Sequence, residues 1–239
     1  MRVLALDSSG LVATVAIVED DQTLAEYTVN YKMTHSQTLL PMLDAMVSMI
    51  GIELTAIDAI AVAGGPGSFT GLRIGSATAK GLGLALNKPL IQIPTADGLA
   101  YNLWETSGLV CPVMDARREQ VYMGIYRCQN GFHVVEEQMA VAVTSLIDKL
   151  NQYGETVHFL GDGVPVYREQ LMEGLQVPCR FAPAQMNRQR AASVGALGIQ
   201  YYKAGKTISA ADYRPDYLRL SQAERERAEQ LKVSKGETK

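Results

Sequence analysis

Two acidic segments are the residues of this chain whose types and spacing best suit chemistry. Asp7-Ser-Ser-Gly10 ends an apolar stretch at residues 3–7, and Asp115-Ala-Arg-Arg-Glu119 ends a similar stretch at 109–115. A carboxylate, hydroxyls and backbone N–H groups after a strand suit nucleotide phosphates or a divalent metal ion. The second segment has two arginines where a loop that wraps phosphates needs glycines. We therefore expect a vestigial nucleotide cleft, with no catalytic residue, lined by Asp7, Ser8, Ser9, Asp115 and Arg117.

A glycine-rich segment, G-G-P-G-S-F-T-G-L-R-I-G at residues 64–75, joins a strand expected at 57–63 to a helix expected at 70–86. Such a loop can hold phosphate. However, it lacks the Gly-Lys of a P-loop, and Thr70 stands where a dinucleotide-binding fingerprint needs its third glycine. Two interpretations stay open: a tight turn with Ser68 or Thr70 capping the helix, or a site for a ligand or partner.

The helix expected at 70–86 has a small residue at every fourth position: Gly71, Gly75, Ala79 and Gly83. Each glycine inside a helix costs about 0.5–1 kcal/mol relative to alanine, so this stripe needs a reason. Close approach of another backbone is the simplest one. That backbone belongs either to the chain's own sheet and neighbouring helix, or to a helix of another chain.

The helix expected at 36–50 has two apolar stripes. One consists of Leu39, Leu40, Leu43, Val47 and Ile50, and the other of Met42, Met46 and Met49. A helix that is apolar on two sides is buried on two sides, and flexible thioethers suit a surface that repacks against a partner. The pattern thus predicts a partner contact, with a helix enclosed inside the monomer as the alternative. Pro41 predicts a kink or a later helix start.

Other signatures of catalysis are missing from the sequence. The three histidines, His35, His133 and His158, are too far apart in the chain for a zinc motif, and no serine lies in a G-x-S-x-G elbow. We therefore expect no bound metal, and we interpret His35 as a residue that caps or packs at a helix start. Three widely spaced cysteines without a C-x-x-C pair indicate free thiols of a reducing compartment.

The whole chain is organised as two similar halves. Apolar periodicity and turn residues predict the order βββαβα twice, so we expect an α/β protein with two lobes, at 1–104 and 105–219, and a charged tail at 220–239. Ligands commonly bind in clefts between lobes. The net charge of −3 argues against a protein that holds nucleic acid alone. Without a signal peptide or an apolar run long enough for a bilayer, we expect a soluble cytoplasmic protein.

Several segments together resemble the TsaB family of bacterial threonylcarbamoyladenosine biosynthesis proteins. They lie in order between Val3 and Arg219, at residues 3–9, 35–43, 64–75, 115–122 and 215–219. The resemblance implies an actin- and Hsp70-like ATPase fold made of two ribonuclease-H-like lobes, which agrees with the repeated βββαβα pattern.

This resemblance also implies a function. It makes the chain a non-catalytic partner of a TsaD-like paralogue that transfers threonylcarbamoyl to the adenosine beside the anticodon of transfer RNAs reading codons that begin with A. ATP and a divalent metal would be used by the partners, a TsaE-like ATPase would dock on the pair, and the chain alone would form a homodimer. Transfer RNA would be contacted only within the complex. The pairing surface is expected at His35, Leu39, Met42, Leu43, Met46, Met49, Gly71, Arg73, Gly75, Ala79 and Gly83. The alternatives are an ATP-using enzyme of the same fold acting alone and, less favoured, a metallopeptidase.

Overall fold

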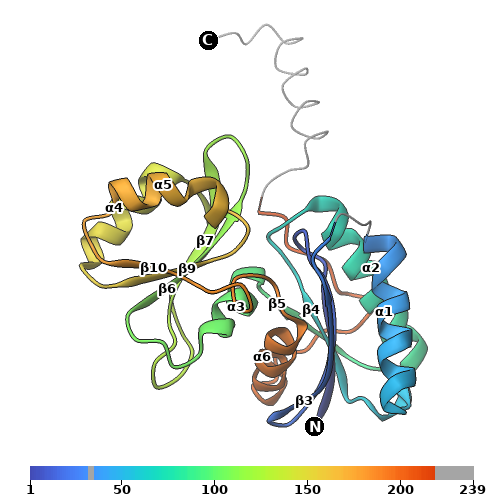
Figure 1. The fold of residues 1–239 in the computed structure, drawn as a ribbon. Helices are drawn as coiled ribbons and strands as arrows, with labels where there is room; N and C mark the ends of the chain where they lie inside the picture. Colours follow the sequence, from blue (N-terminus) through green and yellow to red (C-terminus); the bar gives the residue numbers. More distant parts are fainter. Residues whose placement is uncertain (32–34, 219–239) are drawn as a thin grey trace, which may run out of the picture.

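Two five-stranded sheets form the framework of the molecule (Figure 1). The computed structural model describes residues 1–31 and 35–218, and the charged tail expected at 220–239 lies outside them. The first sheet has the order β3-β2-β1-β4-β5, and its strands are β1 (Arg2–Asp7), β2 (Ala13–Glu19), β3 (Gln22–Val29), β4 (Ala59–Ala63) and β5 (Leu90–Ile93). The second has the order β10-β9-β6-β7-β8, with β6 (Leu109–Asp115), β7 (Gln120–Arg127), β8 (His133–Ala142), β9 (Val157–Leu160) and β10 (Cys179–Phe181).

The two sheets are built in the same way, which confirms the expected duplication. In each, three consecutive strands pair antiparallel, and two later strands are added parallel to the first one: β4 and β5 beyond β1, β9 and β10 beyond β6. Parallel strands need crossover connections, and helices supply them. The corresponding ends of β1 and β6 therefore carry Asp7 and Asp115.

Within residues 1–31 and 35–218, six α-helices cover these sheets: α1 (His35–Ile50), α2 (Phe69–Leu86), α3 (Thr95–Ala100), α4 (Val143–Tyr153), α5 (Val164–Gly174) and α6 (Ala191–Lys203). Helices α1 and α2 lie on one face of the first sheet and α6 on the other, while α3 lies between the lobes (Figure 1). Two short 3-10 helices, at Leu54–Ala56 and Tyr101–Leu103, complete the structure. Within the described part of the chain, no helix is long and apolar enough to cross a bilayer.

The strand β1 is apolar on both faces because the first sheet is buried on both. Leu4 and Leu6 pack under α1 and α2, whereas Val3 and Ala5 pack against α6. A strand covered on two sides has a continuous apolar run instead of alternation.

The three cysteines are free thiols, two of them buried, as expected.

Helix α6 corrects the expected domain boundary. Its Gly195 lies against Val18 and Ala5 of the first sheet, and the segment after it pairs Ile208 with Leu90 of β5. The first lobe thus consists of the beginning of the chain together with residues 191–218. A division at residue 104 separates the strands of the two sheets but assigns α6 to the wrong lobe, because the chain returns to the first sheet at its end.

Candidate functional site

The turn after β1 is held almost entirely by contacts within the chain. Asp7 is 2% exposed, and its Oδ1 accepts hydrogen bonds from the backbone N–H and the hydroxyl of Ser9, at 2.8 and 2.7 Å. The Ser8 hydroxyl donates to the carbonyl of Gly71 in α2 at 2.9 Å. The Ser9 carbonyl accepts from the N–H of Ser68, the N-cap residue of α2, at 2.6 Å. The groups expected to face a nucleotide instead attach the turn to α2.

Burial dominates the electrostatics of Asp7. Loss of hydration raises the pKa of its carboxyl to about 6, although the Ser9 hydrogen bonds and the nearby His35 act in the opposite direction. His35, the first residue of α1, places Nε2 2.7 Å from the carbonyl oxygen of Gly10 and donates to it. His35 therefore packs at the helix start and connects α1 to the same turn.

The small residues of α2 face the chain's own first lobe. A Cβ on Gly71 would lie 2.0 Å from the Ser8 carbonyl oxygen, and one on Gly75 would lie 2.6 Å from the Ser8 hydroxyl. A Cβ on Gly83 would lie 2.9 Å from side-chain atoms of Ala210 and Leu90, and Ala79 is fully buried. The interpretation as packing within the monomer is confirmed. The assignment of these four residues to a partner surface is wrong, since no part of the stripe faces outward.

Most of the predicted α1 surface is also buried. Leu39, Met42, Leu43 and Met46 belong to the core beneath α1, and Met46 is 0% exposed. Of the methionine row, only Met49 is exposed, at 72%. The two apolar stripes therefore do not form two buried faces. The buried residues of both stripes lie on a single face of α1, which packs on the sheet. Pro41 lies inside α1 at an exposed position.

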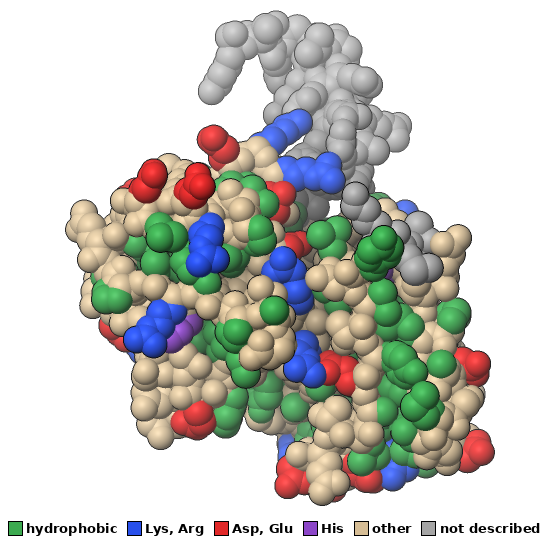
Figure 2. Space-filling model, viewed as in Figure 1, with side chains coloured by type: hydrophobic (Ala, Val, Ile, Leu, Met, Phe, Trp, Pro, Cys, Tyr) green, Lys and Arg blue, Asp and Glu red, His purple; other side chains and the backbone are tan. Residues whose placement is uncertain are grey.

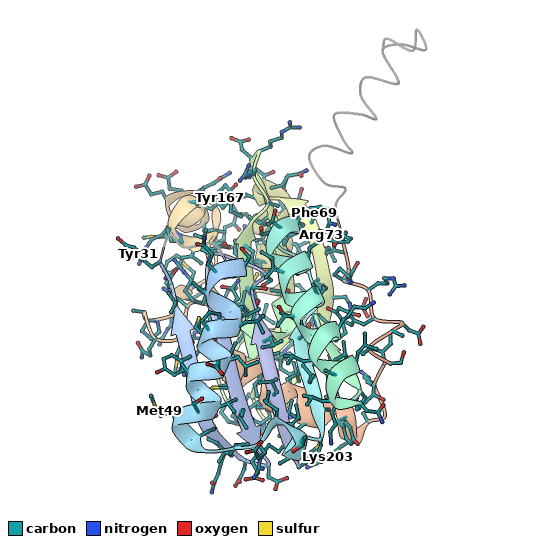
Figure 3. The ribbon with its side chains drawn as sticks, turned by 90° about the vertical axis from the view of Figure 1, so that its right-hand side faces the viewer. Tyr31, Met49, Phe69, Arg73, Tyr167 and Lys203 are labelled. Atoms are coloured by element: carbon teal, nitrogen blue, oxygen red, sulfur yellow. The ribbon has the colours of Figure 1, made fainter. Side chains whose placement is uncertain are left out.

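The outward side of α1 and α2 nevertheless exposes several apolar side chains among polar ones, and we call it the α1–α2 outer face. The two helices pack side by side (Figure 3), and hydrophobic side chains run along α1 in Figure 2. Leu40, Met49 and Leu84 are 51, 72 and 62% exposed. The other exposed apolar or small members are Pro41, Ala45, Ala77, Gly81 and Ala85, and the exposed polar residues of α1 on this side are Gln37, Asp44 and Ser48. The α2 members are not predicted from the sequence, because the glycine stripe on the opposite side of that helix is the stronger pattern.

Arg73, which was predicted at the pairing surface, is exposed near the start of α2 (Figure 3). Its guanidinium carbon lies 5.4 Å from the ring centre of Phe69, a cation–π arrangement. The Phe69 ring also lies 4.9 Å from that of Tyr217. Arg73 therefore borders the α1–α2 outer face at its upper end.

The corresponding turn after β6 is open. Asp115 is exposed, and its Oδ1 accepts from the Arg117 N–H at 2.8 Å and from the Tyr167 hydroxyl at 3.0 Å. Arg117, Arg118 and Glu119 all have left-handed backbones, with φ of 62, 55 and 57°. Their long exposed side chains stand where phosphates would need a close-fitting loop.

The donor set between the lobes does not fit a metal-bound nucleotide. The Asp7 oxygen that faces Ser9 is already bonded twice, and the second-lobe turn offers arginines instead of glycines. Among residues 1–31 and 35–218, no group of three or more His, Cys, Asp or Glu side chains is arranged to hold a metal ion.

Comparisons with known proteins identify the family. The model of the TsaD family, tRNA N6-adenosine threonylcarbamoyltransferase, matches residues 22–227. The tRNA threonylcarbamoyladenosine biosynthesis protein TsaB of Bacillus subtilis is 32% identical over 229 residues, which cover 94% of this chain and 96% of that protein. The chain belongs to the TsaB family. This confirms the resemblance found in the sequence.

Solved structures agree with TsaB membership and with the expected fold. A Pseudomonas aeruginosa protein described as similar to the peptidase YeaZ superposes with a TM-score of 0.79 at 26% identity, covering 91% of this chain and 99% of the other. Component A of (R)-2-hydroxyglutaryl-CoA dehydratase from Acidaminococcus fermentans shares the fold alone, with a TM-score of 0.50 at 14% identity and coverage of 86 and 100%. The architecture is thus the duplicated ribonuclease-H-like, actin- and Hsp70-like fold.

Proposed function

We propose that this TsaB-family chain is the non-catalytic subunit that pairs with a TsaD-like, metal-dependent transferase in the formation of threonylcarbamoyladenosine beside the anticodon of transfer RNA. It works in the cytoplasm, where transfer RNA is found. The ATP and the divalent metal are held by its partners, among them a TsaE-like ATPase. The single observation that carries the proposal is the α1–α2 outer face, because it supplies a contact surface on a member of this family.

The α1–α2 outer face exposes large apolar side chains that an interface would bury. Contiguous exposed apolar surface marks sites of protein association, and a stable interface buries about 800 Å² on each partner. Fully burying a leucine or methionine side chain contributes about 1.5–3 kcal/mol. Leu40, Met49 and Leu84 start from exposed fractions above one half, so together they supply several kcal/mol towards pairing. The same face serves the homodimer when the partner is missing.

The interlobe turns support a subunit without chemistry of its own. Asp7 accepts two hydrogen bonds from Ser9 through Oδ1, and the turn that they hold is attached to α2. Since α2 forms half of the α1–α2 outer face, the former ligand-binding turn now supports the pairing surface. Because the chain has a net charge of −3, it does not attract the phosphates of transfer RNA by itself. Transfer RNA is therefore bound jointly with the partner.

Charge substitutions on the outer face test the pairing. Met49→Glu and Leu84→Glu should fold normally, because both side chains are exposed, and should lower the affinity for a TsaD-like partner at least tenfold in size-exclusion and titration experiments. Val166→Glu on α5 of the second lobe, where the native side chain is 60% exposed, is the matched control and should pair as the wild type does. If both outer-face variants keep the complex at micromolar concentration, the surface assignment is wrong. Met46→Glu is unsuitable, because Met46 is in the core.

Reconstituted reactions test the absence of catalysis and the alternative of an ATP-using enzyme acting alone. The purified chain should neither modify transfer RNA nor bind Mg-ATP tightly in isothermal titration, whereas adding it to the transferase should raise the rate of modification. Modification by the chain alone would overturn the proposed function. One-to-one Mg-ATP binding that is lost in Asp7→Ala would favour the alternative.

A further inference from the structure

One buried carboxylate is bonded to both lobes. Asp97, on the short helix α3 between them, is 3% exposed. Its Oδ1 accepts from the hydroxyl of Tyr126 on β7 of the second sheet, and its Oδ2 accepts from the hydroxyl of Tyr201 on α6, which packs on the first sheet; both distances are 2.8 Å. Neither the expected cleft nor the α1–α2 outer face makes use of this residue.

A second contact joins the lobes at the glycine-rich loop. Gln138, on β8 of the second sheet, donates from Nε2 to the carbonyl of Gly65 at 2.8 Å and accepts from the N–H of Ala96 at 3.3 Å. Gly65 in turn accepts from the N–H of Thr95, the first residue of α3. The side chain of Gln138 thus attaches the second sheet to both the first-lobe loop and the helix between the lobes.

A third contact holds the segment by which the chain returns to the first lobe. Asn102 donates from Nδ2 to the carbonyls of Met186 and Arg188, at 2.9 and 2.7 Å, and accepts from the Ser193 hydroxyl of α6 at 2.6 Å. The guanidinium of Arg188 reaches the carbonyl of Gly161 in the second lobe. Both chain crossings between the lobes are therefore held by side-chain hydrogen bonds.

The Asp97 contact is costly to break. Burial raises the pKa of this carboxyl, while the hydroxyls of Tyr201 and Tyr126 favour its charged form. If the lobes separated at this point, one Asp97 oxygen would lose the hydrogen bond from Tyr126 or Tyr201 without being fully hydrated. Leaving a buried carboxylate without its donor costs more free energy than losing an exposed hydrogen bond.

We propose that Asp97, with Tyr126 and Tyr201, fixes the two lobes as one rigid body. Two-lobed proteins commonly close on their ligands by a hinge motion, and this chain does not. The inference goes beyond the pairing role and does not depend on it. A partner bound at the α1–α2 outer face would also meet the second lobe at a fixed position.

Distance measurements on the full chain test this proposal. Spin labels on cysteines that replace Asp21 of the β2–β3 turn and Met172 of α5, both exposed, report one distance across the lobes in a Cys179→Ser background when the labelled chain is diluted with unlabelled chain. The otherwise unchanged chain should give one narrow distribution that Mg-ATP does not shift. The double variant Tyr126→Phe and Tyr201→Phe should broaden it. Tyr153→Phe, whose hydroxyl donates to Glu136 within the second lobe, is the matched control and should leave it narrow.

Unfolding gives a second readout that covers poorly folding variants. Trp104, the single tryptophan, has its ring 5.1 Å from that of Tyr101 beside the joint, so its fluorescence reports the joint while circular dichroism reports the whole chain. The two urea transitions should coincide in the wild type and separate in Tyr201→Phe. A broad or double distance distribution in the wild type would overturn the proposal. The proposal would also be overturned if the double tyrosine variant gave a distance distribution as narrow as that of the wild type and if its two urea transitions coincided.

Discussion

The turns after β1 and β6 start from the same local geometry and end in opposite environments. In each, the aspartate that ends the strand accepts the N–H of the residue two positions later at 2.8 Å: Ser9 for Asp7, and Arg117 for Asp115. Each faces a loop whose glycine has a left-handed backbone, Gly65 with φ of 117° and Gly161 with φ of 110°. Yet Asp7 is buried and Asp115 is exposed.

The residues that pack against each turn decide the difference. Helix α2 has glycines at the contact with the first turn, so the backbone of Ser8 lies directly against it and the acid beside it is covered. At α5 a glycine also lies close, since a Cβ on its N-cap residue Gly163 would lie 3.1 Å from the Asp115 backbone nitrogen. The Asp115 side chain nevertheless stays exposed and accepts from the Tyr167 hydroxyl of α5. The comparison teaches that burial of the acid that ends each strand depends on the residues packed against its turn and not on the acid itself.

The largest expected effect on stability comes from adding a methyl group at Gly71, where the turn leaves no room for a side chain. Gly71→Ala would place its Cβ 2.0 Å from the Ser8 carbonyl oxygen, so the turn must move, at a cost of about 3 kcal/mol in unfolding free energy. Gly81→Ala in the same helix, where nothing lies within 4 Å, should instead gain about 0.5–1 kcal/mol. Urea unfolding measures both. Equal stabilities of the two variants would show that the turn and α2 are not closely packed.

The second effect concerns the charge of Asp7. A pKa of about 6 in the folded chain, against 3.8 for an ordinary aspartate, means that the folded state binds the proton more strongly. The resulting stabilisation is complete below about pH 4 and is lost as the pH rises through about 6. Asp7→Asn keeps an acceptor for Ser9 without the charge. Its unfolding free energy should match the wild type near pH 4 and exceed it by about 3 kcal/mol at pH 8.

The matched control is Asp115→Asn. This side chain is exposed, so the substitution should change the unfolding free energy by less than about 0.5 kcal/mol across the same pH range. Denaturant titrations at several pH values give both difference curves. A flat curve for Asp7→Asn would mean that its carboxyl is hydrated in the folded chain.

The order of strands and helices could be predicted from the sequence because each element has a clear pattern and clear ends. Strand β1 is a short apolar run ending at Asp7, and α2 begins after Gly64–Ser68 and ends before Asn87, whose left-handed backbone caps it. The duplication follows from the repeated order of such elements. The return of α6 to the first sheet leaves no local signal, because an amphipathic helix fits either lobe.

The site was harder to predict because the sequence gives no local signal for which side of a helix faces the rest of the chain. Met42 and Met49 are both apolar residues of α1, and only the position of the sheet buries the first and exposes the second. The glycine stripe correctly indicated a close backbone contact, but the sequence does not say whose backbone it is. Asp97 stands between apolar and small residues, and nothing in its neighbourhood indicates that Tyr126 and Tyr201 lie within hydrogen-bonding distance.

The smallest expected effect on stability concerns Arg118 in the second turn, where two substitutions separate the cost of the backbone conformation from the loss of the side chain. Arg118 is exposed and has φ of 55°, and a left-handed backbone costs a residue with a Cβ about 1 kcal/mol or more. Arg118→Gly should therefore gain about 0.5–1 kcal/mol in unfolding free energy, whereas Arg118→Ala, which keeps the Cβ, should gain nothing. Equal stabilities of the two variants would mean that the turn is not strained. A gain confined to glycine would show that the left-handed backbone of the second turn, and not the loss of the arginine side chain, sets the difference in stability.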